Sequence, residues 1–486
     1  MNRGFWLVCA FCVIANAGAA DGVVGPGNCD EAGFASVLAT VDGSGGGTVT
    51  FDCGDDVSFA FTSYKTIQNA VTIDGANRIT FDGGDASAFF DIPAGASLTL
   101  QHMIVQHGAF AGVHALENRG HLRLFDVRII LNTSTESPVF NYGRMDVLAS
   151  TFGGNSSEGA GGAITNSNDT PGGTGNGGVL VVGFSSFEAN ASSATGGAIY
   201  NYLAATTLWG VTLNGNTATA GGAVDAFGST VFAMNSTFAD NHATSDAGGA
   251  IRVQETGLRV DNTNLVDNSA ATNGGGISCE VEPTGFSSLY ATTFAGNTAG
   301  GDGGGAYVDC DLTYADVTFN ANTADGSGGA IAAVGANNVS SIDFATMDAN
   351  TAHTGGGLWS DGAGAIAIGH SIVSANVGGN CEGMVTSNGY NLSDDAGCAA
   401  AFTATGDVLD ATLPLMELGD YGGPSLTQPP ASDSAAVDHI PVDACAPNPR
   451  WDERSALRPI GDACDSGAVE LGGVVDFILG NSFESG

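Results

Sequence analysis

The chain has 486 residues, of which 51 are Asp or Glu and only 12 are Lys or Arg, so its formal net charge is −39 at pH 7. Such a surface repels nucleic acid, anionic lipid and polyuronates unless divalent cations intervene, and we expect no nucleic-acid partner. The acidity also keeps a β protein with many strand edges soluble. We therefore expect no cofactor, with diffuse Ca²⁺ binding as the alternative.

Residues 1–20, MNRGFWLVCAFCVIANAGAA, have the features of a secretory signal peptide. Arg3 precedes an apolar run, and the small residues Ala17, Gly18 and Ala19 follow that run. The apolar run is shorter than the ~20 residues that a membrane-spanning helix needs. We expect an exported mature chain without a transmembrane segment.

Residues 21–60 are predicted to form an N-terminal cap. Within them, CDEAGFASVLATV at 29–41 predicts an amphipathic helix that places Phe34, Val37 and Leu38 on one face. Because an open end of a β-solenoid has to be covered, this helix is expected to close the end of the coil that follows.

A repeat with a period near 27 residues fills residues 143–380 and extends more weakly back to residue 61. Its clearest signal is a pair of glycines, and the intervals between successive pairs run from 24 to 35 residues. Short alternating runs follow each pair, which is typical of strands. The pairs begin at Gly161, Gly196, Gly221, Gly248, Gly274, Gly304, Gly328 and Gly355.

A second motif precedes each glycine pair: an aromatic or aliphatic residue three positions ahead of an Asn. Its copies are Phe152/Asn155, Phe187/Asn190, Leu213/Asn216, Phe238/Asn241, Leu265/Asn268, Phe294/Asn297, Phe319/Asn322 and Met347/Asn350. Short strands, turns and a single period predict an all-β fold, a right-handed parallel β-helix over residues 61–380, with coils about 4.8 Å apart.

Stacking explains the residue types in these motifs. The aromatic or aliphatic residues are predicted to form an apolar column inside the coil. Each Asn is predicted to adopt a left-handed conformation at a corner and to form a ladder of hydrogen bonds with its equivalents. The glycine pairs are predicted to turn corners at which a Cβ atom would collide.

The motifs resemble a known family. GGAI at 161–164, 248–251 and 328–331 alternates with FxxN sequences such as FEAN and FADN, and this resembles the repeats of the polymorphic outer membrane proteins. The weaker N-terminal coils resemble the pectate-lyase-like right-handed β-helix superfamily. Both resemblances imply a secreted or cell-surface protein of a Gram-negative bacterium.

The C-terminal part differs from the repeats. Residues 381–472 resemble the disulfide-containing C-terminal region of bacterial surface proteins of the choice-of-anchor type, and residues 473–486 form a tail.

Eight cysteines remain after the signal peptide, and an even number in an exported chain suggests disulfide bonds. Metal binding is the weaker interpretation, because no CxxC or closely spaced Cys/His set is present. The expected bonds join sequence neighbours: Cys29 with Cys53, Cys279 with Cys310, Cys381 with Cys398, and Cys445 with Cys464.

Catalytic candidates are confined to the N-terminal coils, since the repeats from residue 187 to residue 358 are monotonous. The resemblance to pectate lyases implies a basic group for proton abstraction. His102 and His121 could stack on neighbouring coils, with Arg123 beside them. No metal ligands can be named.

Three functions remain open, and the monotony of the repeats favours the first. The first is a structural or adhesin-like rod that contacts cell-surface components or polysaccharides. The second is a polysaccharide lyase or glycoside hydrolase. The third is a glycan-binding protein without catalysis.

Overall fold

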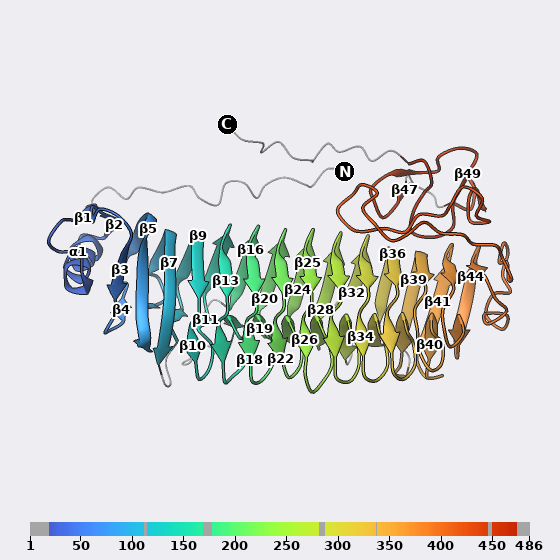
Figure 1. Cartoon of the computed structure of the whole chain (residues 1–486), viewed down its shortest axis with the longest axis horizontal. Coiled ribbons are helices and arrows are strands. Elements are labelled where there is room, and N and C mark those ends of the chain that lie inside the picture. Colours follow the sequence, from blue (N-terminus) through green and yellow to red (C-terminus); the bar gives the residue numbers. More distant parts are fainter. Residues whose placement is uncertain are drawn as a thin grey trace.

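The computed structural model describes residues 19–110, 114–168, 177–280, 287–336, 338–445 and 450–473. The predicted signal peptide, apart from its last two residues, and the predicted tail, apart from Gly473, lie outside the described residues. The described part is a long rod of stacked coils with a helix at one end (Figure 1). The predicted parallel β-helix is confirmed.

One coil, here called a rung, contains four short strands. In a typical rung these are β19 (Ile199–Tyr202), β20 (Ala205–Trp209), β21 (Thr212–Asn214) and β22 (Thr217–Ala218). Each strand pairs in parallel with its equivalent in the next rung, for example Leu213 with Phe238. All backbone ladder bonds therefore run along the rod axis.

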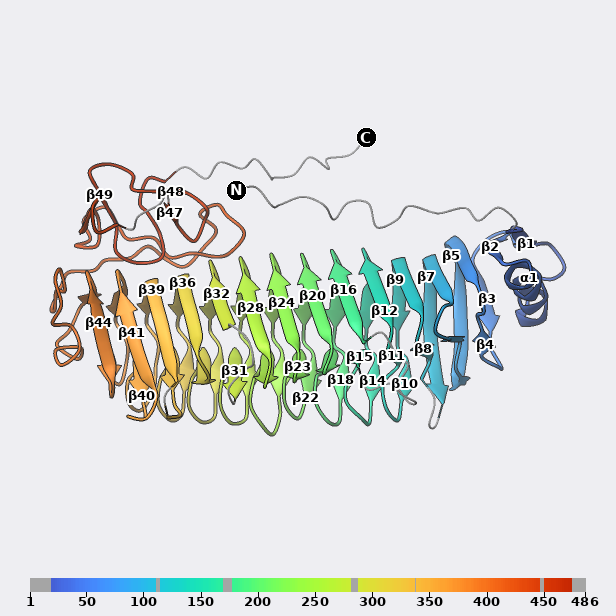
Figure 2. The same cartoon turned by 180° about the vertical axis from the view of Figure 1, so that it is seen from behind.

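The first strands of the rungs form a sheet of thirteen, here called the first wall, so the rod has thirteen rungs. Figure 2 shows this wall along the lower side of the rod. Its remaining strands are β4 (Lys65–Thr66), β6 (Phe90–Ile92), β8 (Leu116–Asn118), β11 (Val139–Asn141), β15 (Ile164–Ser167), β23 (Val224–Phe227), β27 (Ile251–Gln254), β31 (Ile277–Glu280), β35 (Ala306–Asp309), β38 (Ile331–Ala333), β40 (Leu358–Ser360) and β43 (Cys381–Glu382).

The second, third and fourth strands of each rung form the other walls, so β20, β21 and β22 belong to the second, third and fourth wall in that order, together with the strands named next. Long strands bend from the second wall into the third. The strands of the second wall are β5 (Ala70–Ser87), β7 (Ser97–Phe110), β9 (His121–Ile130), β12 (Arg144–Leu148), β16 (Val179–Gly183), β24 (Thr230–Met234), β28 (Gly257–Asp261), β32 (Ser287–Tyr290), β36 (Leu312–Asn320), β39 (Val339–Asp348), β41 (Ala365–Gly369) and β44 (Val385–Gly389).

The separate strands of the third wall are β13 (Thr151–Gly153), β17 (Ser186–Glu188), β25 (Thr237–Ala239), β29 (Asn264–Val266), β33 (Thr293–Ala295), β42 (Ile372–Ser374) and β45 (Leu392–Ser393). Those of the fourth are β10 (Thr133–Ser134), β14 (Ser156–Ser157), β18 (Ala191–Ser192), β26 (His242–Ala243), β30 (Ser269–Ala270), β34 (Thr298–Ala299) and β37 (Thr323–Ala324).

The aromatic or aliphatic residue of the Asn motif lies inside the rod. Parallel register places Phe187, Leu213, Phe238, Leu265, Phe294 and Phe319 one above another. None of these side chains has exposed surface, and neither has Phe152 at the start of the row. The rings of Phe152 and Phe187 stack at 4.7 Å, and those of Phe294 and Phe319 stack at 4.4 Å. The apolar column follows from repeating one residue type at one place in every rung.

The Asn residues form a buried ladder next to this column. Nδ2 of each Asn donates to Oδ1 of the Asn in the next rung at 2.8 to 3.0 Å. The ladder contains Asn132, Asn155, Asn190, Asn216, Asn241, Asn268, Asn297, Asn322, Asn350 and Asn376.

The predicted left-handed conformation of these Asn residues is wrong. The residue before each Asn adopts it instead, as Ala189 and Asp240 do with φ of 51°. That residue turns the corner and leaves the Asn side chain directed into the rod, where its amide has no access to water.

The second glycine of each pair is required by the spacing of the rungs. A Cβ atom on Gly222 would lie 2.1 Å from the carbonyl oxygen of Gly249 in the next rung. In one rung the pair begins at Gly303, with φ of 74°, and not at Gly304 as predicted. Gly304 is the member that faces the next rung, at 2.4 Å from the Gly329 oxygen.

Helix α1 (Glu31–Gly43) closes the N-terminal end of the rod beside β1 (Gly22–Val24), β2 (Gly46–Phe51) and β3 (Val57–Ala60). Phe34 and Leu38 are buried, as their predicted face requires, and Val37 is half-buried. The Phe34 ring lies 5.0 Å from that of Phe81 in the first complete rung. The apolar face of the helix therefore covers the first rung in the place where a preceding rung would otherwise stack.

We expect Asp30→Ala to loosen this cap. The Asp30 side chain accepts a hydrogen bond of 2.8 Å from the backbone N–H of Gly33 in the first turn of α1. Losing such a cap costs about 1 kcal/mol, so amide exchange in α1 should accelerate about fivefold. Hydrogen exchange with mass spectrometry measures this, with the exposed Asp55→Ala as control. Equal rates in both variants would contradict the assigned cap.

The rod continues beyond residue 380, where the coil was predicted to end. β44 and β45 stack on β41 and β42, and Leu392 of β45 forms a further parallel bridge to Val408. The glycine pair Gly378 and Gly379 precedes this rung, but the rung lacks the Asn motif, so the sequence pattern did not reveal it. The four disulfides join Cys29 to Cys53, Cys279 to Cys310, Cys381 to Cys398, and Cys445 to Cys464.

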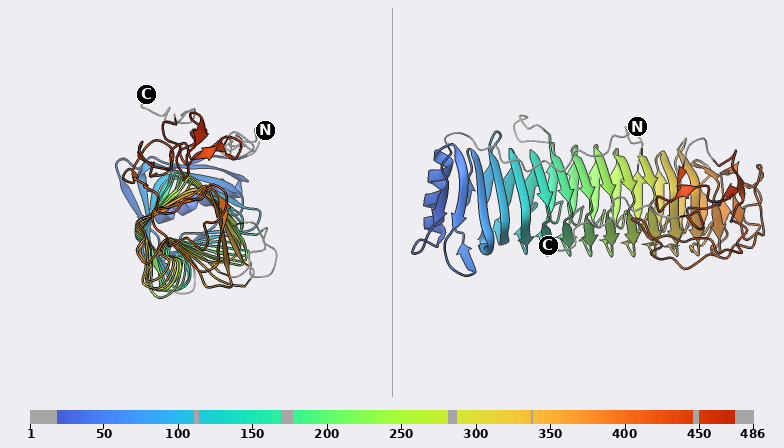
Figure 3. Two further views of the ribbon diagram at one scale, coloured as in Figure 1. Left: turned by 90° about the vertical axis from the view of Figure 1, so that its right-hand side faces the viewer. Right: turned by 90° about the horizontal axis from the view of Figure 1, so that it is seen from above.

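Residues 394–473, here called the C-terminal region, first cover the end of the last rung, where the Val408 N–H donates to the Asn391 carbonyl, and then fold back over the rod. Their strands are β46 (Ile440–Pro441), β47 (Arg450–Trp451), β48 (Leu457–Arg458) and β49 (Ala463–Cys464), which form two short antiparallel pairs. Figure 3 shows this region lying along the last rungs, with the coil seen end-on beneath it.

Candidate functional site

The three catalytic candidates lie on the second wall, but the two histidines do not stack. The register pairs His121 with Ser97, 24 residues earlier, and not with His102. His102 lies at a bend with φ of 52°, and its ring packs against Phe125. The predicted stack is wrong because the rungs here advance by more residues than the 19 that separate the histidines.

Asp146 binds two basic side chains of this wall. Its carboxylate contacts His121 Nε2 at 2.6 Å and Arg144 Nη2 at 2.6 Å. Burial opposes its ionisation, but the hydrogen bonds from His121 and Arg144 outweigh burial and lower its pKa. Arg123 stands beside Asp146 in the register, and burial lowers the pKa of its guanidinium.

The other histidines of this wall also bind carboxylates of the preceding rung. His102 Nδ1 lies 3.1 Å from Asp74 Oδ1, and His107 Nδ1 lies 3.2 Å from Asp82 Oδ2. Each pair joins a histidine of one rung to an Asp of a neighbouring rung, as His121 and Asp146 also do. We therefore interpret these pairs as ties between rungs. In the described part of the chain, no group of three or more His, Cys, Asp or Glu side chains could hold a metal ion.

The outer face of the first wall carries a different set of side chains. Inward residues such as Ile199 and Val224 are fully buried. The residues that alternate with them along each strand point outward. One outward row is Phe140, Thr165, Tyr200, Asp225, Arg252, Ser278, Tyr307, Ala332 and Trp359. The other is Ser167, Tyr202, Phe227, Gln254, Glu280 and Asp309.

Aromatic rings form the N-terminal half of this face. Phe140 stacks on Tyr142 at 4.4 Å, and Tyr202 stacks on Phe227 at 5.7 Å with 14° between the ring planes. Tyr200 and Tyr202 are half-buried, with their rings 6.2 Å apart. The rings form two groups, because Thr165 and Ser167 of β15 separate Phe140 and Tyr142 from the rings that follow. Tyr200, Tyr202 and Phe227 on β19 and β23 are here called the aromatic strip.

Polar groups lie next to this strip. Arg252 donates to both carboxylate oxygens of Asp225, at 2.9 and 3.0 Å, and to Asp246 at 2.9 Å. Burial would lower the pKa of Arg252, but its bonds to Asp225 raise it. Burial and the charge of Asp225 raise the pKa of Tyr200 to about 12, so its hydroxyl keeps its proton at neutral pH. The face therefore offers flat rings together with donors and acceptors.

Sequence reasoning missed this face, although a signal was present. From Thr165 onward, each residue of the first outward row stands four positions after the first glycine of its pair, as Tyr200 does after Gly196 and Asp225 after Gly221. This is the variable position of an otherwise regular repeat. Because its residue type changes from rung to rung, it does not stand out as a motif.

Among the residues that the structure places, no helix is long and apolar enough to cross a membrane.

Comparison with known proteins supports the repeat. Residues 316–334 match the family model of the Chlamydia polymorphic membrane protein repeat. A search of curated proteins found no match. The matched residues run from the bend of β36 into β38 and contain one glycine pair, Gly328 and Gly329. The chain is thus a parallel β-helix repeat protein, and its repeat and its fold fit a β-helix protein of the bacterial surface or outer membrane.

Proposed function

We propose that the protein is exported by its signal peptide and acts at the bacterial surface as an adhesin-like rod that binds polysaccharide. The aromatic strip of the first wall is the observation that carries this proposal. The strip presents ring surface and hydrogen-bonding groups along one line. Such a combination is typical of sites that bind molecules with both apolar faces and hydroxyl groups.

The charge of the rod selects among polysaccharides. With a net charge of −39, the protein repels polyuronates and other anionic chains at long range. Neutral sugars and amino sugars are not repelled. The ring faces of Tyr200 and Tyr202 would contact the C–H groups of the sugar rings. The half-buried side chains of Gln254 and Glu280 would exchange hydrogen bonds with the sugar hydroxyl groups.

We expect the double variant Tyr200→Ala, Tyr202→Ala to bind neutral polysaccharide at least about tenfold more weakly than the wild type, because buried aromatic anchors dominate such contacts. A glycan array identifies the ligand, and calorimetry on the full mature chain gives its Kd. Tyr64→Ala is the matched control, since Tyr64 is 57% exposed and lies outside the strip.

Two outcomes would refute the proposed site. One is a wild type that binds no neutral or amino-sugar polysaccharide. The other is a double variant that binds as tightly as Tyr64→Ala. Release of new reducing ends from any ligand would instead favour the lyase or hydrolase alternative.

A further inference from the structure

The C-terminal region rests on the third wall of the rod and contacts successive rungs from that of Asn264 to that of Tyr390. The backbone N–H of Leu426 donates to Asn264 Oδ1 at 2.8 Å, and that of Ala468 donates to Thr346 Oγ1 at 3.0 Å. Gln428 Nε2 donates to Asp348 at 2.8 Å. These bonds fix the region against side chains that point outward from the rod.

Glu453 is the central contact between this region and the rod, and it is completely buried. Its two carboxyl oxygens lie between two threonines of neighbouring rungs. Oε1 is 2.9 Å from Thr293 Oγ1, and Oε2 is 2.5 Å from Thr318 Oγ1. The Thr293 hydroxyl also contacts the carbonyl oxygen of Leu426.

The number of protons available for the hydrogen bonds of Thr293 determines whether Glu453 is protonated. A threonine hydroxyl has one proton to donate, and a carbonyl oxygen can only accept. If Thr293 donates to Leu426, a hydrogen bond between Thr293 and Glu453 needs a proton on Glu453. The geometry therefore points to Glu453 as a neutral carboxylic acid that donates to Thr293.

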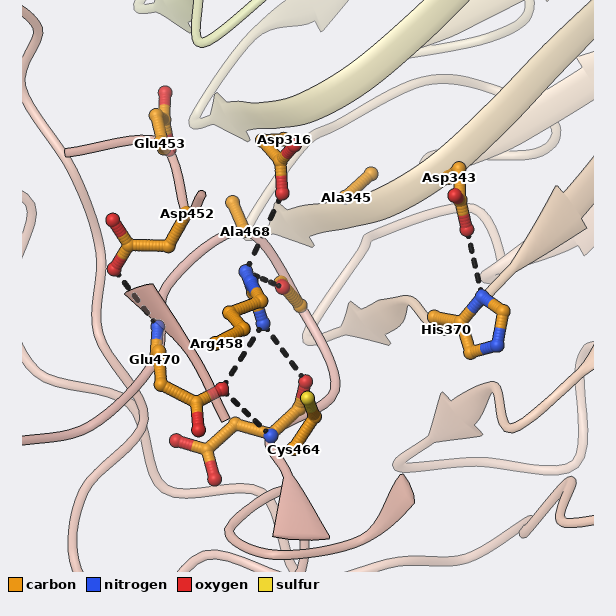
Figure 4. A network of polar contacts seen from close by, with 12 residues as sticks. Asp316, Asp343, Ala345, His370, Asp452, Glu453, Arg458, Cys464, Ala468 and Glu470 are labelled. Carbon is orange, nitrogen blue, oxygen red and sulfur yellow. Dashed lines mark hydrogen bonds and ion pairs between the residues drawn. The ribbon is translucent and has the colours of Figure 1, made fainter. Parts of the chain in front are cut away.

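The surrounding charges favour the same state. Arg454 pairs with Asp452 at 2.7 Å. Figure 4 shows Arg458, which lies 3.4 Å from Glu470 and 3.5 Å from Asp316. Further out, Asp343 pairs with His370 at 2.7 Å. The titratable groups packed around Glu453 and its neighbours are Asp316, Asp343, His370, Asp438, Asp452, Arg454, Arg458, Asp465 and Glu470.

Buried carboxyl groups outnumber buried guanidinium groups at this contact. The carboxyl groups of Asp316, Asp452, Glu453, Asp465 and Glu470 are all buried, and so are the guanidinium groups of Arg454 and Arg458. Burying an unpaired carboxylate is costly, and protonation relieves that cost. Accordingly, burial raises the pKa of Glu453 well above its usual value, and burial raises the pKa of Glu470 to about 7.

We propose that the C-terminal region is a proton-held clasp, which lies on the rod while Glu453 is protonated and lifts from it when Glu453 ionises.

The direction of the pH dependence follows from linkage. A group whose pKa is higher in the docked state stabilises that state below its undocked pKa, and this stabilisation is lost as pH rises through the docked pKa. The stabilisation from protonated Glu470 is lost over the pH range between its usual pKa of 4.5 and its raised pKa of about 7. For Glu453 the corresponding pH range begins at the same value and ends well above it. The clasp is therefore closed in acid and weakens as the pH rises.

Hydrogen exchange on the full mature chain tests the clasp. The Leu426 and Ala468 amides, which donate to the rod, report docking, and the buried Phe238 in β25 is the reference. After correction for intrinsic exchange, we expect their protection to fall at least about tenfold between about pH 6 and about pH 9. Protection at Phe238 should stay constant.

Glu453→Gln keeps the shape of the side chain and has no proton to lose. Its amide can still donate to Thr293 and accept from Thr318, so the two reporter amides should keep more protection at high pH than in the wild type, and only the contribution of Glu470 should be lost. Glu417→Gln, at an exposed position of the same region, is the control and should keep the wild-type pH dependence. Wild-type behaviour of Glu453→Gln would overturn the proposal, as would pH-independent protection in the wild type.

A second variant keeps the test decisive if Glu453→Gln does not dock. Thr293→Val removes the hydroxyl that accepts the Glu453 proton, so loss of protection should begin at a lower pH than in the wild type. An unchanged midpoint in Thr293→Val would also overturn the proposal.

Discussion

Phe294→Ala should lower the free energy of unfolding by about 3 to 5 kcal/mol, because it empties one position in the apolar column of the rod. Phe294 has no exposed surface, and its ring stacks on that of Phe319 at 4.4 Å with 8° between the planes. The neighbouring rungs are held at the β spacing by their backbone bonds and cannot close the cavity. Denaturant unfolding followed by circular dichroism measures the loss.

Phe184→Ala is the matched control for this prediction. Phe184 is 57% exposed and touches Trp209 at a ring distance of 4.5 Å on the outside of the same rod. Truncating it should cost no more than about 1 kcal/mol. If both variants lost the same stability, the column would not be the main source of cohesion between rungs.

Asn241→Leu should cost about 2 to 6 kcal/mol, because it leaves two buried donors of Asn216 without their acceptor at about 1 to 3 kcal/mol each. The Asn241 Oδ1 atom accepts from the backbone N–H of Asn216 at 3.0 Å and from its Nδ2 at 2.9 Å. Leu is similar in volume, so loss of hydrogen bonds and not a cavity would cause the change. The same unfolding measurement applies.

Asn214→Leu makes the same substitution at an exposed position two residues before Asn216 in the same rung. It should change stability by less than about 0.5 kcal/mol. A ladder variant as stable as this control would mean that water or a shifted backbone replaces the lost amide.

The regular part of the rod was predictable because stacking repeats one environment in every rung. A position that is buried once is buried in each coil, so Phe187, Phe238 and Phe294 recur where the interior needs a large apolar residue. The period of the motif therefore gave the fold. Which residue takes the left-handed conformation could not be read in this way, since Ala189 and Asp240 share no side-chain type.

The less regular contacts were not predictable from spacing. Pairing of His121 with Ser97 depends on the length of the bends in β7 and β9, where no glycine pair marks the register. The contact of Glu453 with Thr293 joins two segments 160 residues apart. No local pattern encodes such a contact, and Glu453 is one of 51 acidic residues in the chain.

The difference between short and long sequence separations also sets the order in which contacts form during folding. Ladder bonds such as the one from Asn216 to Asn241 close loops of 25 residues, so each rung can form on the previous one at a small entropic cost. The rod surface that the C-terminal region contacts cannot form one rung at a time, since its residues Asn264, Thr293, Thr318 and Thr346 come from four rungs. It exists only after all four have assembled in register. Docking of the C-terminal region is thus the last step, and it succeeds only on a correctly wound rod.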